Sequence, residues 1–331
     1  MKNILDIKDL NVKFYTDDGV VSAVNGIDLQ ISKGETLGLV GETGAGKSTT
    51  ALGIMGLIDS PPGKVESGRI FFSGRDLCTL KEDEYRKVRG KDISMIFQDP
   101  MTALNPVFRV IDQISEVIEN HRNVSQKQAE EEAVKMLELV RIPASRAYDY
   151  PHQFSGGMKQ RVVIAIALAC NPQLLIADEP TTALDVTIQA QILELMKDLK
   201  HEIKTSMLLI THDLGVVAEI CDRVAIMYAG EIVECGTLED IFENPLHPYT
   251  NGLFGSIPDI EKEIEFLSPI EGMMPDPVML PSGCKFHPRC KYAQPLCAEV
   301  LPTSIENSPG HSVRCLIYEG KLGKVEVVKY E

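Results

Sequence analysis

The segment GETGAGKSTT (41–50) has the residue types and spacing of a phosphate-binding loop. Its glycines let consecutive backbone N–H groups point inward, and the helix expected after it adds a positive N-terminal end. Lys47 would reach the outer phosphates of a nucleotide, and Ser48 would hold Mg²⁺. A glycine-rich turn without a ligand is the alternative, but the apolar strand before the loop favours phosphate binding. The predicted nucleotide-binding residues here are Gly41, Glu42, Thr43, Gly44, Ala45, Gly46, Lys47, Ser48 and Thr49.

Two adjacent acids follow the apolar run LLIA (174–177). Ligands of open α/β sheets bind beyond the carboxyl ends of the strands, where Asp178 and Glu179 are expected to lie. Asp178 would hold Mg²⁺ directly or through water, and Glu179 would orient and polarise the attacking water. A solvated turn is the alternative, and the phosphate loop elsewhere in the chain argues against it.

Gln98 and His212 also directly follow apolar strand-like runs, ISMIF and the LLIT of LLITHDL. Taken alone, Gln98 could be an ordinary exposed residue and His212 a core residue bonded to backbone. Both are expected at the carboxyl ends of strands that border the phosphate loop, where a γ-phosphate and its Mg²⁺ would lie. This shared position favours a functional role for both.

A second anion-binding helix start is predicted in FSGGMKQR (154–161). Ser155 occupies a helix-cap position, and Gly156 and Gly157 follow it. The chain thus has two predicted phosphate-binding helix N-termini, more than a hundred residues apart. This arrangement is explained if the second one completes the nucleotide site of a partner subunit.

Patterns of apolar residues indicate the elements that must position these groups. Segments 4–14 and 26–31 alternate apolar and polar residues, as half-exposed antiparallel strands do. Short buried strands alternate with helices, which indicates a parallel sheet covered by helices. The predicted fold is α/β: a P-loop ATPase core with a mixed sheet, an antiparallel β subdomain, a helical insert at about 100–160, and a small Cys-rich C-terminal tail domain. The buried strands are expected at 36–40, 93–97, 174–177, 206–210 and 223–228, and the helices at 125–140, 156–169 and 185–203.

Composition limits the possible partners of this 331-residue chain. Its net charge of −15 makes nucleic acid an unexpected partner, because nucleic-acid binding needs clustered Lys and Arg. The N-terminal residues lack the apolar core of a signal peptide, and the longest apolar run is shorter than the ~20 residues that span a bilayer. We expect a cytosolic protein that meets a membrane only through partners.

Four cysteines crowd into a proline-rich tail after residue 257, where nine of the 19 prolines lie between 258 and 309. Structural zinc sites usually pair cysteines two to four residues apart, whereas longer and uneven spacings suit an iron–sulfur cluster. Zinc and unligated thiols are the alternatives. His287 and His311 could replace a cysteine in a zinc site but are expected to be ordinary loop residues. The candidate ligands of a 4Fe–4S cluster are Cys284, Cys290, Cys297 and Cys315.

The order of these motifs, including ALD at 183–185, resembles that of the ATP-binding-cassette ATPases from residue 4 to about 240. The resemblance implies a head-to-tail dimer that sandwiches two ATP molecules. Gln98 would sense Mg²⁺ and the γ-phosphate, Glu179 would be the catalytic base, and His212 would contact the γ-phosphate. It also implies that an aromatic side chain stacks on adenine, and that other residues reach the partner: Phe14 or Tyr15 at adenine, Asp185 at the dimer interface, and Ser155, Gly156 and Gly157 on the partner's ATP.

Several features narrow the resemblance to peptide importers and their nickel-carrying relatives. The signature has Phe154 and Met158 in place of the commoner Leu and Gln, and residues 244–258 are similar to the segment after the ATPase core in that branch. The branch implies a 4Fe–4S cluster at the tail cysteines. The predicted domains are 1–243 for the cassette core, 244–258 for the importer segment and 259–331 for the Cys-cluster domain.

The predicted function is therefore the ATP-hydrolysing subunit of a membrane transporter that imports dipeptides or oligopeptides. The implied partners are two integral membrane permease subunits, a second related ATPase subunit and, indirectly, an extracytoplasmic substrate-binding protein. The chain would lie peripherally at the cytoplasmic face of the membrane. The alternatives are a soluble non-transport cassette ATPase, a redox-sensing regulatory protein, and the ATPase of a nickel or metal-complex importer. The last stays open because other subunits of such a transporter choose the cargo.

Overall fold

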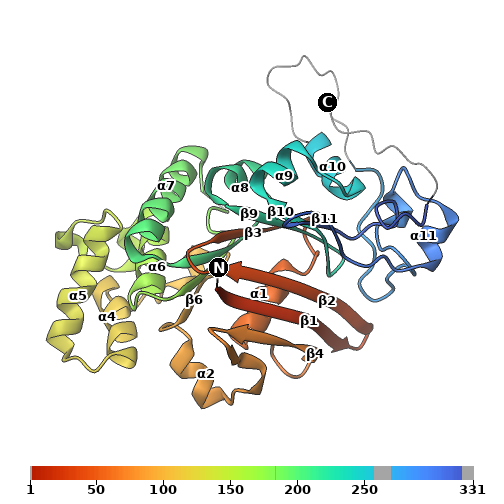
Figure 1. Cartoon of the computed structure of the whole chain (residues 1–331). Coiled ribbons are helices and arrows are strands. Elements are labelled where there is room, and N and C mark those ends of the chain that lie inside the picture. The colour runs from red at the N-terminus through yellow and green to blue at the C-terminus, as the bar shows by residue number, and fades with distance from the viewer. Residues whose placement is uncertain (1, 183, 257–269, 323–331) are drawn as a thin grey trace.

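A computed structural model describes residues 2–182, 184–256 and 270–322 (Figure 1). Ala183 of the predicted ALD motif, the predicted boundary at 258/259 and the end of the tail domain lie outside this range. The described chain forms two sheets with helices around them.

The smaller sheet is antiparallel and has the order β2-β1-β4-β5. The first two strands confirm the alternating patterns, since apolar side chains such as Leu10 and Val12 are fully buried on the inner face. The sequence analysis missed the third strand in the order, whose residues are mostly exposed or half-exposed and mix polar with apolar types. The strands are β1 (Asn3–Thr16), β2 (Gly19–Ser32), β4 (Gly63–Phe72) and β5 (Arg75–Asp76).

The larger sheet is mixed and has the order β11-β12-β10-β9-β3-β8-β7-β6. The strands from β9 to β6 run parallel, and the other three are antiparallel to their neighbours. The parallel part confirms the buried strands expected from apolar runs. Its members are β3 (Thr36–Val40), β6 (Ile93–Ile96), β7 (Leu174–Asp178), β8 (Ser206–Thr211) and β9 (Arg223–Tyr228), and the added strands are β10 (Glu231–Thr237), β11 (Ile305–Ser308) and β12 (His311–Val313).

The larger sheet divides two hydrophobic cores because successive side chains of a strand point to opposite faces. In β8, Leu208 and Ile210 pack with α1 and the smaller sheet, whereas Met207 and Leu209 pack in the core that the other helices build. Polar groups at the carboxyl ends of these strands are thus held on a rigid base.

Helices cover the sheet, and the region 100–160 contains helices and no strand among its described residues, as expected. Within it, α5 begins at a capping box in which Ser125 and Gln128 bond each other's backbone. In Figure 1, α4 and α5 form the left end of the molecule, beside α6. The helices are α1 (Lys47–Met55), α2 (Glu82–Val88), α3 (Pro100–Ala103), α4 (Val110–His121), α5 (Gln126–Leu139), α6 (Gly156–Leu168), α7 (Val186–Ile203), α8 (Leu214–Ile220), α9 (Leu238–Glu243), α10 (Pro248–Gly255) and α11 (Pro295–Glu299).

The tail, residues 270–322, is joined to the core by regular structure that the sequence analysis did not predict. β12 pairs with β10 and so extends the larger sheet, and β11 pairs with β12. His311 was expected in a loop, but it begins β12, is buried, and lies 2.8 Å from Glu234 (Nε2 to Oε1). Sheet pairing and a buried His–Glu contact therefore hold the tail to the core.

None of the helices in the described ranges combines the length and apolar character needed to cross a bilayer.

Candidate functional site

The phosphate loop connects β3 to α1, and its glycines are required by close backbone approach. A Cβ atom on Gly41 would lie 2.1 Å from the carbonyl oxygen of Met227. Gly46, which precedes α1, has φ 103, and a Cβ there would lie 2.3 Å from the carbonyl oxygen of Ala23. No side chain caps the start of α1, and its first turn holds no acidic residue. The helix N-terminus is thus left available to an anion.

Lys47 is buried at the base of this loop. Its Nζ donates hydrogen bonds to the carbonyl oxygens of Gly41 (2.6 Å) and Glu42 (3.0 Å). Burial lowers the pKa of the Lys47 ammonium, while the acids Glu179, Asp178 and Glu42 act in the opposite direction. The cation is therefore placed inside the loop and within the field of the two acids after β7.

Glu179 is fixed by three side chains from three different segments. Gln98 Nε2 and Thr182 Oγ1 donate to its Oε2, at 2.8 and 3.0 Å, and His212 Nδ1 lies 3.0 Å from its Oε1. Burial raises the pKa of Glu179, but the hydrogen bonds from His212 and Thr182 outweigh it and hold that pKa below its usual range. The carboxylate is thus ionised and oriented. Its φ of 47 is a left-handed conformation that is uncommon for a residue other than glycine.

The structure brings together Gln98, Glu179 and His212 as predicted, but one reason for that prediction was wrong. β8, which precedes His212, borders β3, whereas β6, which precedes Gln98, is separated from β3 by β8 and β7. Gln98 reaches the site because its side chain bonds Glu179. Thr182 was missed, and the signal was its place three residues after the acid.

Asp178 is buried at the end of β7 beside Ser48. Burial raises the pKa of Asp178, whereas a hydrogen bond from Ser48 opposes the rise. Its Oδ1 is buried and has no hydrogen-bond partner among the described residues. An unpartnered carboxylate oxygen next to a hydroxyl fits Mg²⁺, which takes hard oxygen ligands and completes its shell with water and substrate phosphates.

The predicted signature residues lie at the start of α6. Ser155 caps this helix by accepting a hydrogen bond from Met158 N at 3.4 Å. Packing within the chain requires glycine at position 157, since a Cβ there would lie 2.6 Å from Ile188 Cγ2 of α7. Gly156 is exposed, and among the described residues a Cβ on it would meet only Leu184 Cδ2, at an ordinary 3.9 Å. Internal packing therefore explains one of the two glycines and not the other.

Asp185 is exposed and caps α7 by accepting from Ile188 N at 3.0 Å. The hydrogen bonds of Asp185 and Ser155 described here stay within their own helix starts and do not reach the phosphate loop. Of the adenine candidates, Phe14 is half-buried against the core shared with α1, and Tyr15 is 50% exposed and bonds Glu66.

All four tail cysteines line one small pocket, which also has His287 and Phe286 in its wall. Its volume is about 20 Å³, roughly the space of one water molecule. All four are free thiols, and Cys284 N donates to Cys297 O at 2.8 Å. In the ranges that the structure describes, no three or more His, Cys, Asp or Glu side chains are grouped so as to hold a metal ion. The thiols share a pocket, but they do not form a preformed single-ion site.

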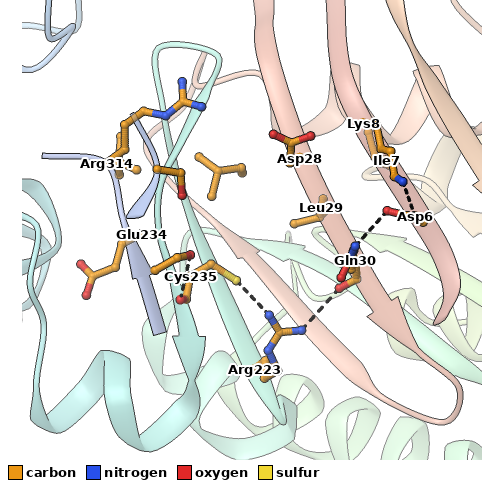
Figure 2. Close-up of a pocket in the computed structure, with 14 residues that line it drawn as sticks. Asp6, Ile7, Lys8, Asp28, Leu29, Gln30, Arg223, Glu234, Cys235 and Arg314 are labelled. Atoms are coloured by element: carbon orange, nitrogen blue, oxygen red, sulfur yellow. Dashed lines mark hydrogen bonds and ion pairs between the residues drawn. The ribbon is translucent and has the colours of Figure 1, made fainter. Parts of the chain in front are cut away.

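A separate pocket of about 330 Å³ lies between the smaller sheet, β9, β10 and the tail (Figure 2). It contains none of the predicted site residues. Its charged groups bond locally, as where Arg223 bonds Gln30 O and Cys235 Sγ. We therefore interpret it as the junction of the two sheets.

Comparisons with known families agree with this geometry. Residues 24–182 match the family described as ABC transporter, and residues 233–297 match the one described as oligopeptide/dipeptide transporter, C-terminal region. The second match spans the end of the core, α10 and three of the four tail cysteines. It thus covers the segment in which composition changes.

Similar proteins span nearly the whole chain. The oligopeptide transport ATP-binding protein AppD of Bacillus subtilis (strain 168) is 52% identical, covering 96% of this chain and 98% of that protein. The oligopeptide transport ATP-binding protein OppD of Escherichia coli (strain K12) is 50% identical, covering 94% and 92%.

Among solved structures, the dimeric post-hydrolysis state of the ATP-binding cassette MJ0796, bound to ADP and Pi, is similar with a TM-score of 0.63. It is 29% identical and covers 71% of this chain and 98% of its own. The sequence relatives and the fold point the same way, and this chain belongs to the ABC transporter ATP-binding proteins, in their oligopeptide and dipeptide branch.

Proposed function

We propose that this chain hydrolyses ATP to drive peptide import through separate membrane subunits. The observation that carries the proposal is the pair of acids after β7. Asp178 offers an unpartnered buried oxygen, and Glu179 beside it is ionised and held by three side chains. Relatives that span the chain are transport ATP-binding proteins for oligopeptides and dipeptides.

Each predicted residue has a role in this proposal. The loop amides and Lys47 hold the phosphates, and Ser48, Asp178 and Gln98 hold Mg²⁺. When bound there, Mg²⁺ would neutralise the charge that develops on the phosphates during hydrolysis. Glu179 accepts the proton of the attacking water, and His212 contacts the γ-phosphate. An aromatic side chain of β1, Phe14 or Tyr15, stacks on adenine.

A second cassette completes the site. Ser155, Gly156 and Gly157 cap the ATP of a partner subunit, and Asp185 lies at the interface. The exposure of Gly156 supports this, because the described part of the chain gives no steric reason for glycine there. The dimeric state of the similar MJ0796 cassette supports it too. We propose that the partner is a related ATPase subunit, so that the working pair is a heterodimer.

The remaining partners follow from the family. We propose two integral membrane permease subunits, an extracytoplasmic substrate-binding protein that acts indirectly, and a position at the cytoplasmic face of the membrane. The proposed domains are 1–243, 244–258 and 259–331. A soluble non-transport role is disfavoured because the relatives are named for peptide transport. Co-purification with membrane subunits rather than ribosomes or DNA would separate the two.

The four tail thiols are proposed to hold a 4Fe–4S cluster, with zinc as the alternative. Support comes from the shared pocket, to which all four cysteines contribute although they are spread over 32 positions of the chain, from 284 to 315. The pocket would have to open to admit a group larger than one ion. A structural role, fastening the tail, fits its position better than electron transfer.

The central test is Glu179→Gln, compared with Lys47→Ala. The glutamine variant should lose turnover while keeping ATP bound, because the base is removed and the phosphate cradle is not. The alanine variant should lose ATP binding itself. Steady-state hydrolysis at the wild-type rate in Glu179→Gln would overturn the assignment.

A further inference from the structure

An arginine of the tail contacts the phosphate loop. The guanidinium of Arg289 forms a two-point ion pair with Glu42, at 3.0 Å (Nη1 to Oε2) and 3.3 Å (Nη2 to Oε1). These residues are 247 positions apart in the chain. Only 6% of the Arg289 side chain is exposed. Bidentate pairs of this kind fix direction as well as charge.

The guanidinium is itself held firmly in place. Its Nε donates to the carbonyl oxygen of Glu271 at 3.0 Å, and its carbon lies 5.8 Å from the ring centre of Tyr228 in the larger sheet. The backbone of Glu42 has a second C-terminal contact, because its N–H donates to the Tyr249 hydroxyl at 3.0 Å. Residue 42 is thus fixed on both its backbone and its side chain by segments beyond residue 240.

The charge of Glu42 explains what this contact does. Glu42 is the second residue of a loop that is built to receive a triphosphate, and an unpaired carboxylate would repel that anion. The repulsion would be strong because the loop is partly shielded from water, and charges that are shielded from water are screened less. A bidentate guanidinium neutralises the carboxylate and holds it in one direction.

We propose that Arg289 is a positioning residue of the nucleotide site: through Glu42 it neutralises and orients the phosphate loop, so that the tail takes part in ATP binding. This inference rests on the proposed role of residues 41–49 as the triphosphate site. It assigns the tail a function that does not depend on which group, if any, the four thiols hold.

The chain offers a matched control for mere anchoring of the tail. Arg314 is also a tail arginine with an acidic partner in the core, since its Nη1 lies 3.7 Å from Glu231 Oε2. Its backbone N–H donates to Val233 O at 2.8 Å. It fastens the tail to β10 without contacting the phosphate loop. A variant of Arg314 therefore perturbs tail docking and leaves the proposed device intact.

The experiment measures the dissociation constant of MgATP for the full chain, with a fluorescent ATP analogue as probe. Arg289→Ala should weaken binding about tenfold, and Arg314→Ala should stay within about twofold of wild type. The double variant Glu42→Gln/Arg289→Ala should recover most of the loss, because the repelling charge is gone. Added salt should narrow the gap between Arg289→Ala and wild type by screening that charge.

Arg289→Lys provides the test if the alanine variant does not fold. It keeps the positive charge but not the two-point geometry, so binding should weaken by about threefold. Wild-type affinity in Arg289→Ala would overturn the inference, as would a loss that Glu42→Gln does not rescue or an equal loss in Arg314→Ala. Lysine-variant binding as weak as that of Lys47→Ala would overturn it too.

Lys47→Ala separates this inference from the proposed function. If Lys47→Ala abolishes ATP binding and Arg289→Ala does not change it, only the positioning role is wrong. If Lys47→Ala binds ATP normally, the loop is not the triphosphate site and the proposed function itself is wrong.

Discussion

Gln98 Nε2 donates a 2.8 Å hydrogen bond to Oε2 of Glu179, although 81 residues separate the two along the chain. This bond connects the end of β6, at the edge of the larger sheet, to the proposed base. Gln98 lies two residues before α3, so the bond joins the proposed base to the start of the helical region.

Thr182→Val should lower kcat about tenfold while leaving ATP affinity nearly unchanged. The threonine hydroxyl donates to Glu179 Oε2 at 3.0 Å. A hydrogen bond to a charged group contributes about 1.5 kcal/mol, close to the value that changes a rate tenfold. Steady-state ATPase kinetics with a parallel binding measurement would check this. Valine keeps the shape of threonine, and a variant with wild-type kcat would contradict the positioning role of Thr182.

The two signature glycines should fail in different ways. Gly157→Ala should destabilise the isolated chain by about 1–3 kcal/mol, because the new methyl group would overlap Ile188, 2.6 Å away. Gly156→Ala should keep wild-type stability, since its Cβ meets no atom of the described residues closer than 3.9 Å, but should weaken ATP-dependent dimerisation. Urea denaturation and sedimentation with ATP measure the two effects. Unchanged dimerisation in Gly156→Ala would argue against a partner's ATP at this helix start.

Metal analysis of anaerobically purified protein tests the tail thiols. A 4Fe–4S cluster should give a brown protein with broad absorption near ~400 nm and about four irons per chain. Cys290→Ser should bleach the colour and loosen residues 270–322, and Cys78→Ser, at an exposed thiol far from the pocket in sequence, should do neither. One zinc per chain without iron would replace the cluster by a zinc site, and absence of any metal would leave ordinary thiols.

Arg314→Ala should destabilise the fold by about 1–3 kcal/mol near neutral pH and by less near pH 5. Burial raises the pKa of Glu231 above its usual 4.5, and Arg314 and Lys285 oppose the rise. The pKa of Glu231 is higher in the folded chain than in the unfolded chain. This carboxyl therefore contributes less to the free energy of unfolding as pH rises from the unfolded pKa to the folded pKa. Removing Arg314 raises the pKa of Glu231 in the folded chain further. The loss of stability is therefore largest near neutral pH, where Glu231 must stay ionised.

Urea denaturation of wild type and variant at about pH 5 and about pH 8 would show whether the loss of stability is larger at the higher pH. The control is the double variant Glu231→Gln/Arg314→Ala. Because it lacks the titrating carboxyl, its stability relative to Glu231→Gln should depend little on pH. A loss that is equal at both pH values would contradict the role of Glu231.

Local chemistry was predictable from the sequence, and long-range contact was not. The loop 41–48 and the acids 178 and 179 each follow a short buried strand, so a few residues define their context. Arg289 has no local signal, because its importance comes from a partner 247 residues away. β4 was missed for a related reason, because it mixes polar and apolar residues and its backbone partner is the distant β1. β10 pairs with the adjacent β9, but its own residues do not alternate regularly between buried and exposed.

The pairing of β12 with β10 has a consequence for how such a cassette tolerates being cut. Without the tail, the N–H and C=O groups of β10 that now face β12 would lie at an open sheet edge, a surface that recruits other chains. β11, an edge strand of the larger sheet, is short and carries the charge of Glu306, so it is a poor template for the addition of a further strand. A shortened chain that stops before the tail would therefore be expected to self-associate through its sheet, even where its ATPase motifs are complete.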